Sequence, residues 1–252
     1  MPLQEFENRV AIVTGASSGI GRATAELLIE RGARVAVFAR SAGKLKSLAR
    51  KYGERMIAVP GDVSDAGSVE RLFSETESRF GRCDILINDA GTYVSKRIEK
   101  MSERDWDRVF AVNVRGAFLT IRRAAKGMIA RRSGAIVNVS SISGVPGPEK
   151  FPGFSAYCAS KAALISFTES LAVELKEHGI RVNSVNPTVV LTEMGKRAWS
   201  DPAKGGPMLA RIPLGRFAEC EDIASVVCFL LSDASRMLNG LALPIDGGFH
   251  TT

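Results

Sequence analysis

Two residues with titratable side chains, Tyr157 and Lys161, stand four positions apart in a stretch that predicts a helix over residues 156–178. Side chains four positions apart lie on the same face of a helix. A free phenol has a pKa of about 10, and a neighbouring ammonium group favours the tyrosinate and lowers that value. We therefore predict that Tyr157 acts as a general acid or base and that Lys161 tunes its pKa.

A glycine-rich segment near the N-terminus has the composition of a phosphate-binding loop. Gly15, Gly19 and Gly21 follow a β-branched run over residues 9–14, and a helix is predicted over residues 19–31. Glycines at such a joint let backbone approach a pyrophosphate, and the helix N-terminus offers oriented N–H groups. The spacing differs from the usual Gly-x-Gly-x-x-Gly fingerprint. A plain tight turn without a ligand is the alternative. The position of the glycine segment at the first strand–helix joint favours a nucleotide site.

The end of the second predicted strand, over residues 34–39, indicates which dinucleotide is bound. An acidic residue there would hydrogen-bond the free ribose 2′-hydroxyl of NAD. This chain has Ala39 and Arg40 instead. An arginine at this place can meet a 2′-phosphate with a charge-assisted contact, although a solvated surface arginine is the alternative. The pair predicts NADP(H) as the cofactor.

Short apolar runs alternate with longer helical patterns along the whole chain. Strands are predicted over residues 9–14, 34–39, 56–60, 84–88, 135–140, 181–186 and 241–245. Helices are predicted over residues 19–31, 42–52, 65–80, 103–131, 156–178 and 220–232. Such alternation predicts an α/β fold with helices on both faces of a parallel sheet. We predict a single Rossmann-type, doubly wound domain over residues 1–252, with about seven strands in the order 3-2-1-4-5-6-7.

Two longer irregular stretches, residues 143–155 and 191–208, interrupt this alternation after predicted strands. Open α/β sheets bind ligands at the carboxyl ends of their strands, and long loops there are usually functional. We predict that both stretches are substrate loops.

Composition excludes several classes of protein. The net charge of +7 is spread along the chain, whereas a nucleic-acid-binding protein usually concentrates its basic residues. No stretch approaches the roughly 18 apolar residues of a membrane span. The four cysteines and two histidines form no metal-binding pattern, so no metal is expected. We predict a cytoplasmic protein with reduced cysteines.

Five motifs carry a resemblance to the short-chain dehydrogenase/reductase family, in the expected order and over nearly the whole chain. They are Thr-Gly-x-x-x-Gly-x-Gly at residues 14–21, Asn88-Asp-Ala-Gly91, Asn113-Val-Arg-Gly, Val139-Ser-Ser141 and Tyr157-x-x-x-Lys161. Two positions depart from the pattern: Asp89 stands where the family more often has asparagine, and Thr188 where it usually has glycine.

The resemblance implies a catalytic set of Asn113, Ser141, Tyr157 and Lys161. Ser141 would hydrogen-bond the substrate oxygen, Tyr157 would transfer the proton, and Asn113 would hold a water that relays protons. Lys161 would also bind the nicotinamide ribose. Ser140 is the rival serine, but the family places the active hydroxyl just past the strand.

The resemblance also implies two sets of binding residues. Those expected to bind the cofactor are Gly15, Ser17, Ser18, Gly19, Ile20, Gly21, Arg40, Asp62, Val63, Asn88, Ala90, Gly91, Tyr157, Lys161, Pro187, Val190 and Thr192. Those expected to bind the substrate are Ser141, Ser143, Leu191, Met194 and Trp199.

From residue 185 onward the sequence is more narrowly similar to the L-xylulose (dicarbonyl) reductases and tetrameric carbonyl reductases. The resemblance implies reduction of a small carbonyl compound, such as a sugar or α-dicarbonyl, by a homotetramer. Ser141 and Tyr157 are 16 residues apart, longer than is usual, and the extra residues within 145–153 should alter specificity. The alternatives are a 3-oxoacyl-[acyl-carrier-protein] reductase and a non-catalytic cofactor-sensing protein.

Overall fold

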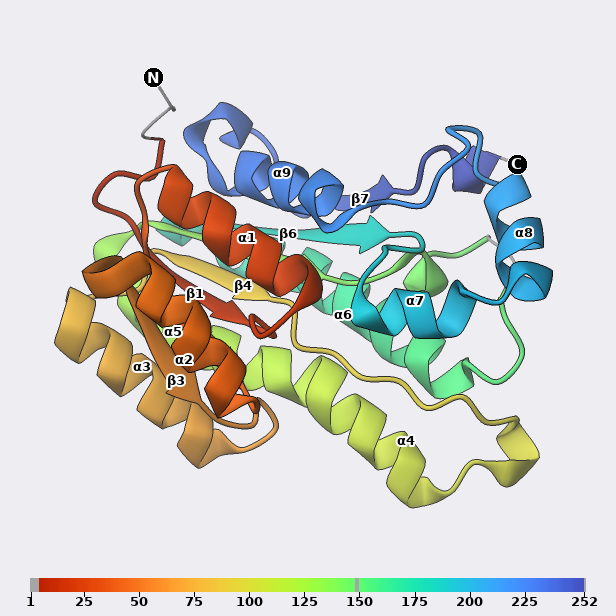
Figure 1. Ribbon diagram of the computed structural model, residues 1–252. Coiled ribbons are helices and arrows are strands. Elements are labelled where there is room, and N and C mark those ends of the chain that lie inside the picture. Colours follow the sequence, from red (N-terminus) through yellow and green to blue (C-terminus); the bar gives the residue numbers. More distant parts are fainter. Residues whose placement is uncertain (1–4, 148–149, 252) are drawn as a thin grey trace.

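The computed structural model describes residues 5–147 and 150–251, without the side chains of Met194, Arg197 and Ala198. Seven parallel strands form one sheet in the order β3-β2-β1-β4-β5-β6-β7, which confirms the predicted topology (Figure 1). The strands are β1 (Val10–Thr14), β2 (Arg34–Ala39), β3 (Met56–Pro60), β4 (Ile85–Asn88), β5 (Gly134–Val139), β6 (Ile180–Pro187) and β7 (Ala242–Ile245). Each lies within one residue of its predicted bounds.

Helices cover both faces of the sheet. They are α1 (Gly19–Glu30), α2 (Ala42–Tyr52), α3 (Ala66–Phe80), α4 (Glu103–Phe110), α5 (Gly116–Arg131), α6 (Ser155–Glu174), α7 (Glu193–Trp199), α8 (Pro202–Ala210) and α9 (Cys220–Leu231). No helix in the described part of the chain is long and apolar enough to cross a membrane.

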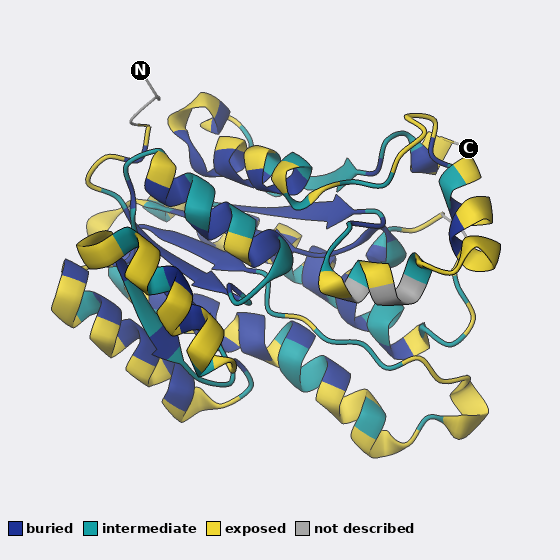
Figure 2. Ribbon diagram, viewed as in Figure 1, coloured by how far each residue is buried: buried dark blue, intermediate teal, exposed yellow. Residues whose placement is uncertain are grey.

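Alternation along the strands divides the core into two layers. Ala11 and Val13 of β1 face a cluster built with α1, α2 and α9. Ile12 faces the opposite cluster, built with α3, α5 and α6. Because the sheet is covered on both sides, its central strands β1 and β4 are buried throughout, and β5 is buried from its second residue onward (Figure 2). The two layers hold the carboxyl ends of β1, β4, β5 and β6 together at one edge.

The predicted long helix over residues 103–131 is continuous but irregular. A π-helical segment, η3 (Ala111–Arg115), joins α4 to α5. Such segments are rare, occur mostly as single turns inside α-helices, and are frequent at functional sites. It contains Asn113, so this side chain leaves the helix at a position that α-helical spacing alone would not give.

The prediction of an irregular loop over residues 191–208 was wrong. The segment contains α7 and most of α8, which lie beside the carboxyl edge of the sheet (Figure 1). Thr192 caps α7 by accepting a hydrogen bond from the backbone N–H of Gly195, and Asp201 caps α8 with Pro202 in its first turn. Capping residues of this kind stabilise short helices that lack a long apolar stripe.

Candidate active site

The phosphate loop owes its shape to glycines. Gly15 and Gly19 have φ angles of +72° and +62°, in the left-handed region that other residues rarely adopt. A Cβ on Gly15 would lie 2.8 Å from the backbone nitrogen of Ala90, at the end of β4. The loop therefore passes directly against the neighbouring strand end, leaving the N-terminus of α1 open to the cavity.

Tyr157 and Ser141 meet in this cavity. Tyr157 rises from the first turn of α6, and Ser141 follows β5, where its Oγ accepts a hydrogen bond from the backbone N–H of Ser143 at 3.1 Å. Burial raises the pKa of Tyr157 to about 12, and a hydrogen bond with the Ser141 side chain opposes that shift. The expected lowering of the tyrosine pKa was wrong for this structure, because the phenol is taken out of water.

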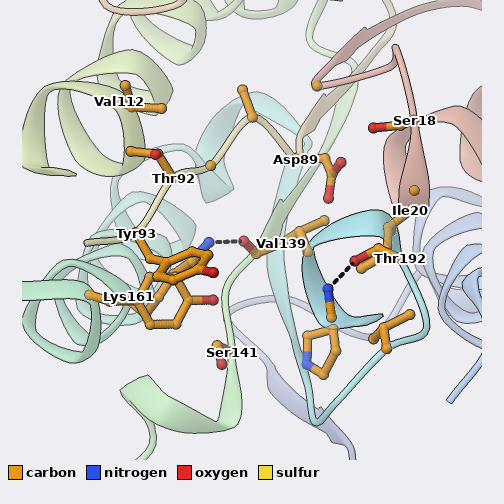
Figure 3. Close-up of a pocket in the computed structure, with 18 of the residues that line it drawn as sticks. Ser18, Ile20, Asp89, Thr92, Tyr93, Val112, Val139, Ser141, Lys161 and Thr192 are labelled. Carbon is orange, nitrogen blue, oxygen red and sulfur yellow. Dashed lines mark hydrogen bonds between the residues drawn. The ribbon is translucent and has the colours of Figure 1, made fainter. Parts of the chain in front are cut away.

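Lys161 lies one helical turn after Tyr157, as the spacing predicts. Its Nζ is 5.7 Å from the centre of the Tyr157 ring and donates a hydrogen bond to the carbonyl oxygen of Val139 at 2.8 Å (Figure 3). Burial lowers the pKa of Lys161 to about 8. The ammonium is thus held between β5 and the ring, within reach of the cavity.

The two neighbouring serines have different surroundings. Ser140 is buried and donates its hydroxyl hydrogen to the backbone carbonyl of Lys161 at 2.9 Å. It therefore anchors β5 to α6. Ser141 lies one residue later, in extended backbone, and faces Tyr157. The geometry supports Ser141 as the serine available to a substrate.

Two predicted residues, Asn113 and Asn88, lie behind the cavity wall. Asn113 bonds the backbone N–H and carbonyl of Thr92 and donates to Ser160 Oγ. Asn88 donates to Asn138 and accepts from Thr120. Since these amides are engaged in buried bonds, their contribution to the site is to fix the backbone after β4 and the start of α6.

Most of the other predicted residues do line one cavity of about 420 Å³. Its wall contains these predicted residues: Gly15, Ser17, Ser18, Gly19, Ile20, Arg40, Asp62, Val63, Ala90, Gly91, Ser141, Ser143, Tyr157, Lys161, Pro187, Val190, Thr192 and Trp199. They come from the ends of several strands, so the fold brings together segments that are far apart in sequence. Figure 3 shows Ser18, Ser141, Lys161 and Thr192 around this space.

Leu191 does not reach this cavity and is corrected here as a predicted substrate residue. Val190 and Ala218 pair as extended backbone, and neighbouring side chains of extended backbone point to opposite sides. Val190 therefore lines the cavity, whereas Leu191 lines a separate depression with Leu209 and Phe217. The side chain of Met194, also predicted to bind substrate, lies outside the described part of the structure.

Gly21 does not line the cavity either. Its backbone N–H donates to Asp89 Oδ2 at 2.8 Å, and a Cβ there would lie 2.6 Å from that oxygen. The third glycine of the loop thus permits close packing of α1 on the chain after β4.

An aromatic wall was missed by the sequence analysis. The Tyr93 and Phe154 rings stack at 5.6 Å, and both meet Tyr157 edge-on at 6.4 Å. Phe151 packs on Trp199 at 5.1 Å. Both phenylalanines, Phe151 and Phe154, lie in the long segment between Ser141 and Tyr157, whose length was the available signal.

The adenosine end of the cavity is bordered by Arg40 and Asp62. Burial alone would raise the pKa of Asp62, but hydrogen bonds from Ser64 and the charge of Arg40 hold it below its ordinary value. Asp62 is therefore an anionic hydrogen-bond acceptor, and Arg40 is an exposed cation at the rim. Together with the glycine cradle, these groups fit a nicotinamide dinucleotide laid along the strand ends.

Comparisons with known proteins agree with this geometry. Residues 15–250 match the family model described as Enoyl-(Acyl carrier protein) reductase. An L-xylulose reductase of Bos taurus is 43% identical over 97% of both chains. A D-threitol dehydrogenase of Mycolicibacterium smegmatis is 41% identical, and an NAD-dependent glycerol dehydrogenase of Listeria innocua is 39% identical. They cover 97% and 96% of this chain, and 94% of each relative is matched.

A solved structure described as a short chain dehydrogenase/reductase family protein superposes with a TM-score of 0.89. It is 35% identical, and the match covers 98% of this chain and 100% of that one. The similarity therefore extends over the sheet, the phosphate loop and the Tyr157–Lys161 helix alike.

Proposed function

Since the chain belongs to the short-chain dehydrogenase/reductase family, we propose that it is an NADP(H)-dependent oxidoreductase that reduces small sugar or α-dicarbonyl compounds, or oxidises the matching alcohols. The observation that carries this proposal is the convergence of Ser141, Tyr157 and Lys161 on the cavity that the phosphate loop borders, with Lys161 Nζ 5.7 Å from the centre of the Tyr157 ring. A protein that only binds a cofactor has no need of this acid–base arrangement.

In this proposal the protein's own groups act on the substrate oxygen. When bound, the nicotinamide supplies or accepts the hydride. Ser141 holds the substrate oxygen by a hydrogen bond, and Tyr157 Oη donates the proton during reduction. Because the pKa of Tyr157 is raised to about 12, the phenol is protonated at neutral pH and ready to donate. Lys161 supplies a nearby positive charge that favours the tyrosinate formed.

The choice of NADP(H) is supported by Arg40 at the cavity rim, with Ala39 in place of an acidic residue. Asp62 feels the charge of Arg40, but its carboxylate accepts hydrogen bonds from the backbone N–H and the hydroxyl of Ser64. The exposed guanidinium of Arg40 is therefore accessible to a phosphate. One relative is named as NAD-dependent, so the similarity does not decide between NAD and NADP, and kinetics with each cofactor are the test.

The substrate class is supported by the named activities of the relatives, a xylulose reductase and a threitol dehydrogenase. The test is oxidation of NADPH with a panel of L-xylulose, diacetyl and an acetoacetyl thioester. Turnover of the first two and not the thioester is expected. A preference for the thioester would instead favour 3-oxoacyl-[acyl-carrier-protein] reduction, and inactivity on the whole panel would contradict the proposed function.

The proposal extends to how the enzyme is organised. Residues 1–252 would act as one cytoplasmic domain, with the segments 143–155 and 191–208 covering the substrate, and the active form would be a homotetramer. Exposed apolar side chains on the helical layer of α4, α5 and α6 support assembly: Trp106 is 38%, Phe118 41% and Val173 65% exposed.

A further inference from the structure

Four aromatic residues besides Tyr157 line the end of the cavity where Ser141 and Tyr157 meet. They come from the chain after β4, from the segment before α6 and from the end of α7, and we call this region the aromatic end. Each residue is half-buried, so part of its side chain is open to the cavity. The four residues are Tyr93, Phe151, Phe154 and Trp199.

The wall beside Tyr157 is held in place by contacts between two segments of the chain. The rings of Tyr93 and Phe154 stack with their centres 5.6 Å apart, and each meets the Tyr157 ring edge-on at 6.4 Å. The backbone N–H of Lys96 donates to the carbonyl oxygen of Gly153 at 3.0 Å, which ties the two segments together. Figure 3 shows Tyr93 among the residues that line the cavity. The chain itself therefore builds a flat apolar surface next to the proton donor.

A second aromatic pair joins the two segments that are proposed to cover the substrate. Phe151, in the segment before α6, meets Trp199 of α7 edge-on, with the ring centres 5.1 Å apart. Both rings pack on a small apolar cluster that includes Ile142, Val189 and Met208, which also line the cavity. The surface that these residues present to a substrate is therefore apolar.

Among the described residues, few polar side chains are available at the aromatic end. Ser141 and Tyr157 act on the reacting oxygen in the proposed mechanism, and Ser141 Oγ already accepts the backbone N–H of Ser143. Thr188 lines the cavity, but its Oγ1 is buried beneath the lining. A sugar bound here would lose water from several hydroxyl groups and regain few hydrogen bonds, which is unfavourable. An apolar ring has no such loss and gains contact with aromatic faces.

We propose that the aromatic end selects carbonyl compounds that carry a flat apolar ring beside the reacting carbonyl, with aryl α-dicarbonyls as the matching class and sugars as poor substrates. Phe151 and Phe154 are specificity-determining residues, since their rings contact the ring of the substrate and not the reacting atoms. Both lie in the segment between Ser141 and Tyr157 that is longer than usual in the resembling family.

The inference rests on the proposed function for its chemistry and narrows the substrate class. Reduction converts one of the two carbonyl groups to a secondary alcohol, with the hydride from NADPH and the proton from Tyr157. The second carbonyl and the ring are unchanged, so the ring serves only for recognition.

The first test compares kcat/KM for three carbonyl compounds with NADPH. Methyl phenyl diketone is diacetyl with one methyl group replaced by a phenyl ring. We expect its kcat/KM to exceed that of diacetyl by at least about tenfold, a scale on which apolar pockets discriminate, and L-xylulose to be the poorest of the three. Equal values for the two diketones, or a preference for L-xylulose, would overturn the inference and leave the proposed function intact.

Variants separate the ring contacts from the intrinsic reactivity of the diketones. Phe151→Leu and Phe154→Leu keep an apolar side chain but remove the flat ring, so the ratio of kcat/KM for methyl phenyl diketone over diacetyl should fall about three- to tenfold. Because the ratio is taken within one protein, a general loss of activity cancels. Phe217→Leu is the matched control: Phe217 packs on the same apolar cluster but lines the separate depression, so the ratio should be that of the wild type. Unchanged ratios in both test variants would reject the role of these rings.

Binding without turnover distinguishes this inference from the proposed function. Calorimetric titration of the protein saturated with oxidised cofactor, which has no hydride to donate, gives the dissociation constant of each diketone. We expect methyl phenyl diketone to bind at least about tenfold more tightly than diacetyl, and Phe151→Leu to reduce that difference. Such a preference in a protein that turns over none of the panel would reject the proposed function but support the aryl-selective site. Equal binding of the two diketones by an active enzyme would reject the aryl-selective site alone.

Discussion

At the scale of single residues, burial controls the chemistry of the site more strongly than sequence spacing indicates. The four-residue interval between Tyr157 and Lys161 places both on one helix face, but both side chains are withdrawn from water. Burial disfavours each charged form, so it raises the pKa of the phenol and lowers that of the ammonium. The result is a neutral phenol at neutral pH, which suits proton donation to a carbonyl oxygen.

Replacing the phenol tests this role directly. Tyr157→Phe keeps the ring but removes the proton donor, so turnover should fall at least about a hundredfold, the usual scale of general acid catalysis. NADPH binding, followed by its fluorescence, should persist. Tyr52→Phe is the matched control, because Tyr52 hydroxyl bonds Glu26 on α1 outside the cavity. Near-normal turnover of Tyr157→Phe would remove Tyr157 from the mechanism.

Cofactor preference should depend on Arg40. A charged hydrogen bond contributes about 1.5–3 kcal/mol, so NADPH should be preferred over NADH by roughly one to two orders of magnitude in kcat/KM. Arg40→Asp should weaken NADPH use and relatively favour NADH. Lys46→Asp makes the same charge change at an exposed position of α2 and should leave the preference unchanged. Equal kinetics of the wild type with both cofactors would contradict the assignment.

Sequence reasoning identified the residues of the cavity better than their contacts. Motif spacing gave Ser141, Tyr157 and the phosphate loop, because their positions follow from strand ends and helix periodicity. It could not give the buried bonds of Asn113 to Thr92 and Ser160, which join three separate segments.

At the scale of elements, the turn after β5 sets the distance between Ser141 and Tyr157. This turn, η4 (Ile142–Gly144), packs on α6 so closely that a Cβ on Gly144 would lie 2.6 Å from the Lys161 carbonyl carbon and 2.7 Å from Ala162 nitrogen. These are backbone atoms of a helix, which cannot move aside as the end of a flexible side chain can. Any side chain here must therefore push the turn away from the helix.

Gly144→Ala should accordingly weaken both folding and catalysis. Overpacking of this kind costs about 1–3 kcal/mol, which a urea unfolding curve would resolve. Turnover should fall because Ser141 moves relative to Tyr157. Gly43→Ala in α2 is the control: its Cβ would meet nothing within 4 Å, and alanine should stabilise the helix by up to about 1 kcal/mol. Unchanged stability and activity in Gly144→Ala would show that the turn can relax.

The strands were predictable because their buried runs of β-branched residues are bounded by turns, and the strand order follows from right-handed crossovers. The helices α7 and α8 were not, since their signal lies in the caps Thr192 and Asp201 rather than in an apolar period. The π-helical segment η3 was also not predictable, because its sequence continues the helical pattern on either side.

At the scale of the whole molecule, the helices α3, α4, α5 and α6 combine surface ion pairs with exposed apolar side chains. Arg123 of α5 forms ion pairs with Glu70 and Glu77 of α3, so charged side chains cover the surface between these two helices. Elsewhere in this group of helices, Trp106 of α4, Phe118 of α5 and Val173 of α6 remain exposed. Strand β7 at the end of the sheet is only partly buried along its length. An exposed strand edge and exposed apolar side chains both favour association with another chain.

A symmetric assembly would cover both surfaces, one interface using the helical layer and the other using β7. Multi-angle light scattering at micromolar concentration should give a mass near four times 27.1 kDa, with a dimer if only one interface forms. Val173→Glu or Phe118→Glu should reduce that mass, because a charge would then be buried at the helical interface. Ser47→Glu adds the same charge on α2, on the other face of the sheet, and should leave the mass unchanged. A fully active wild-type monomer would show that these surfaces are tolerated in water.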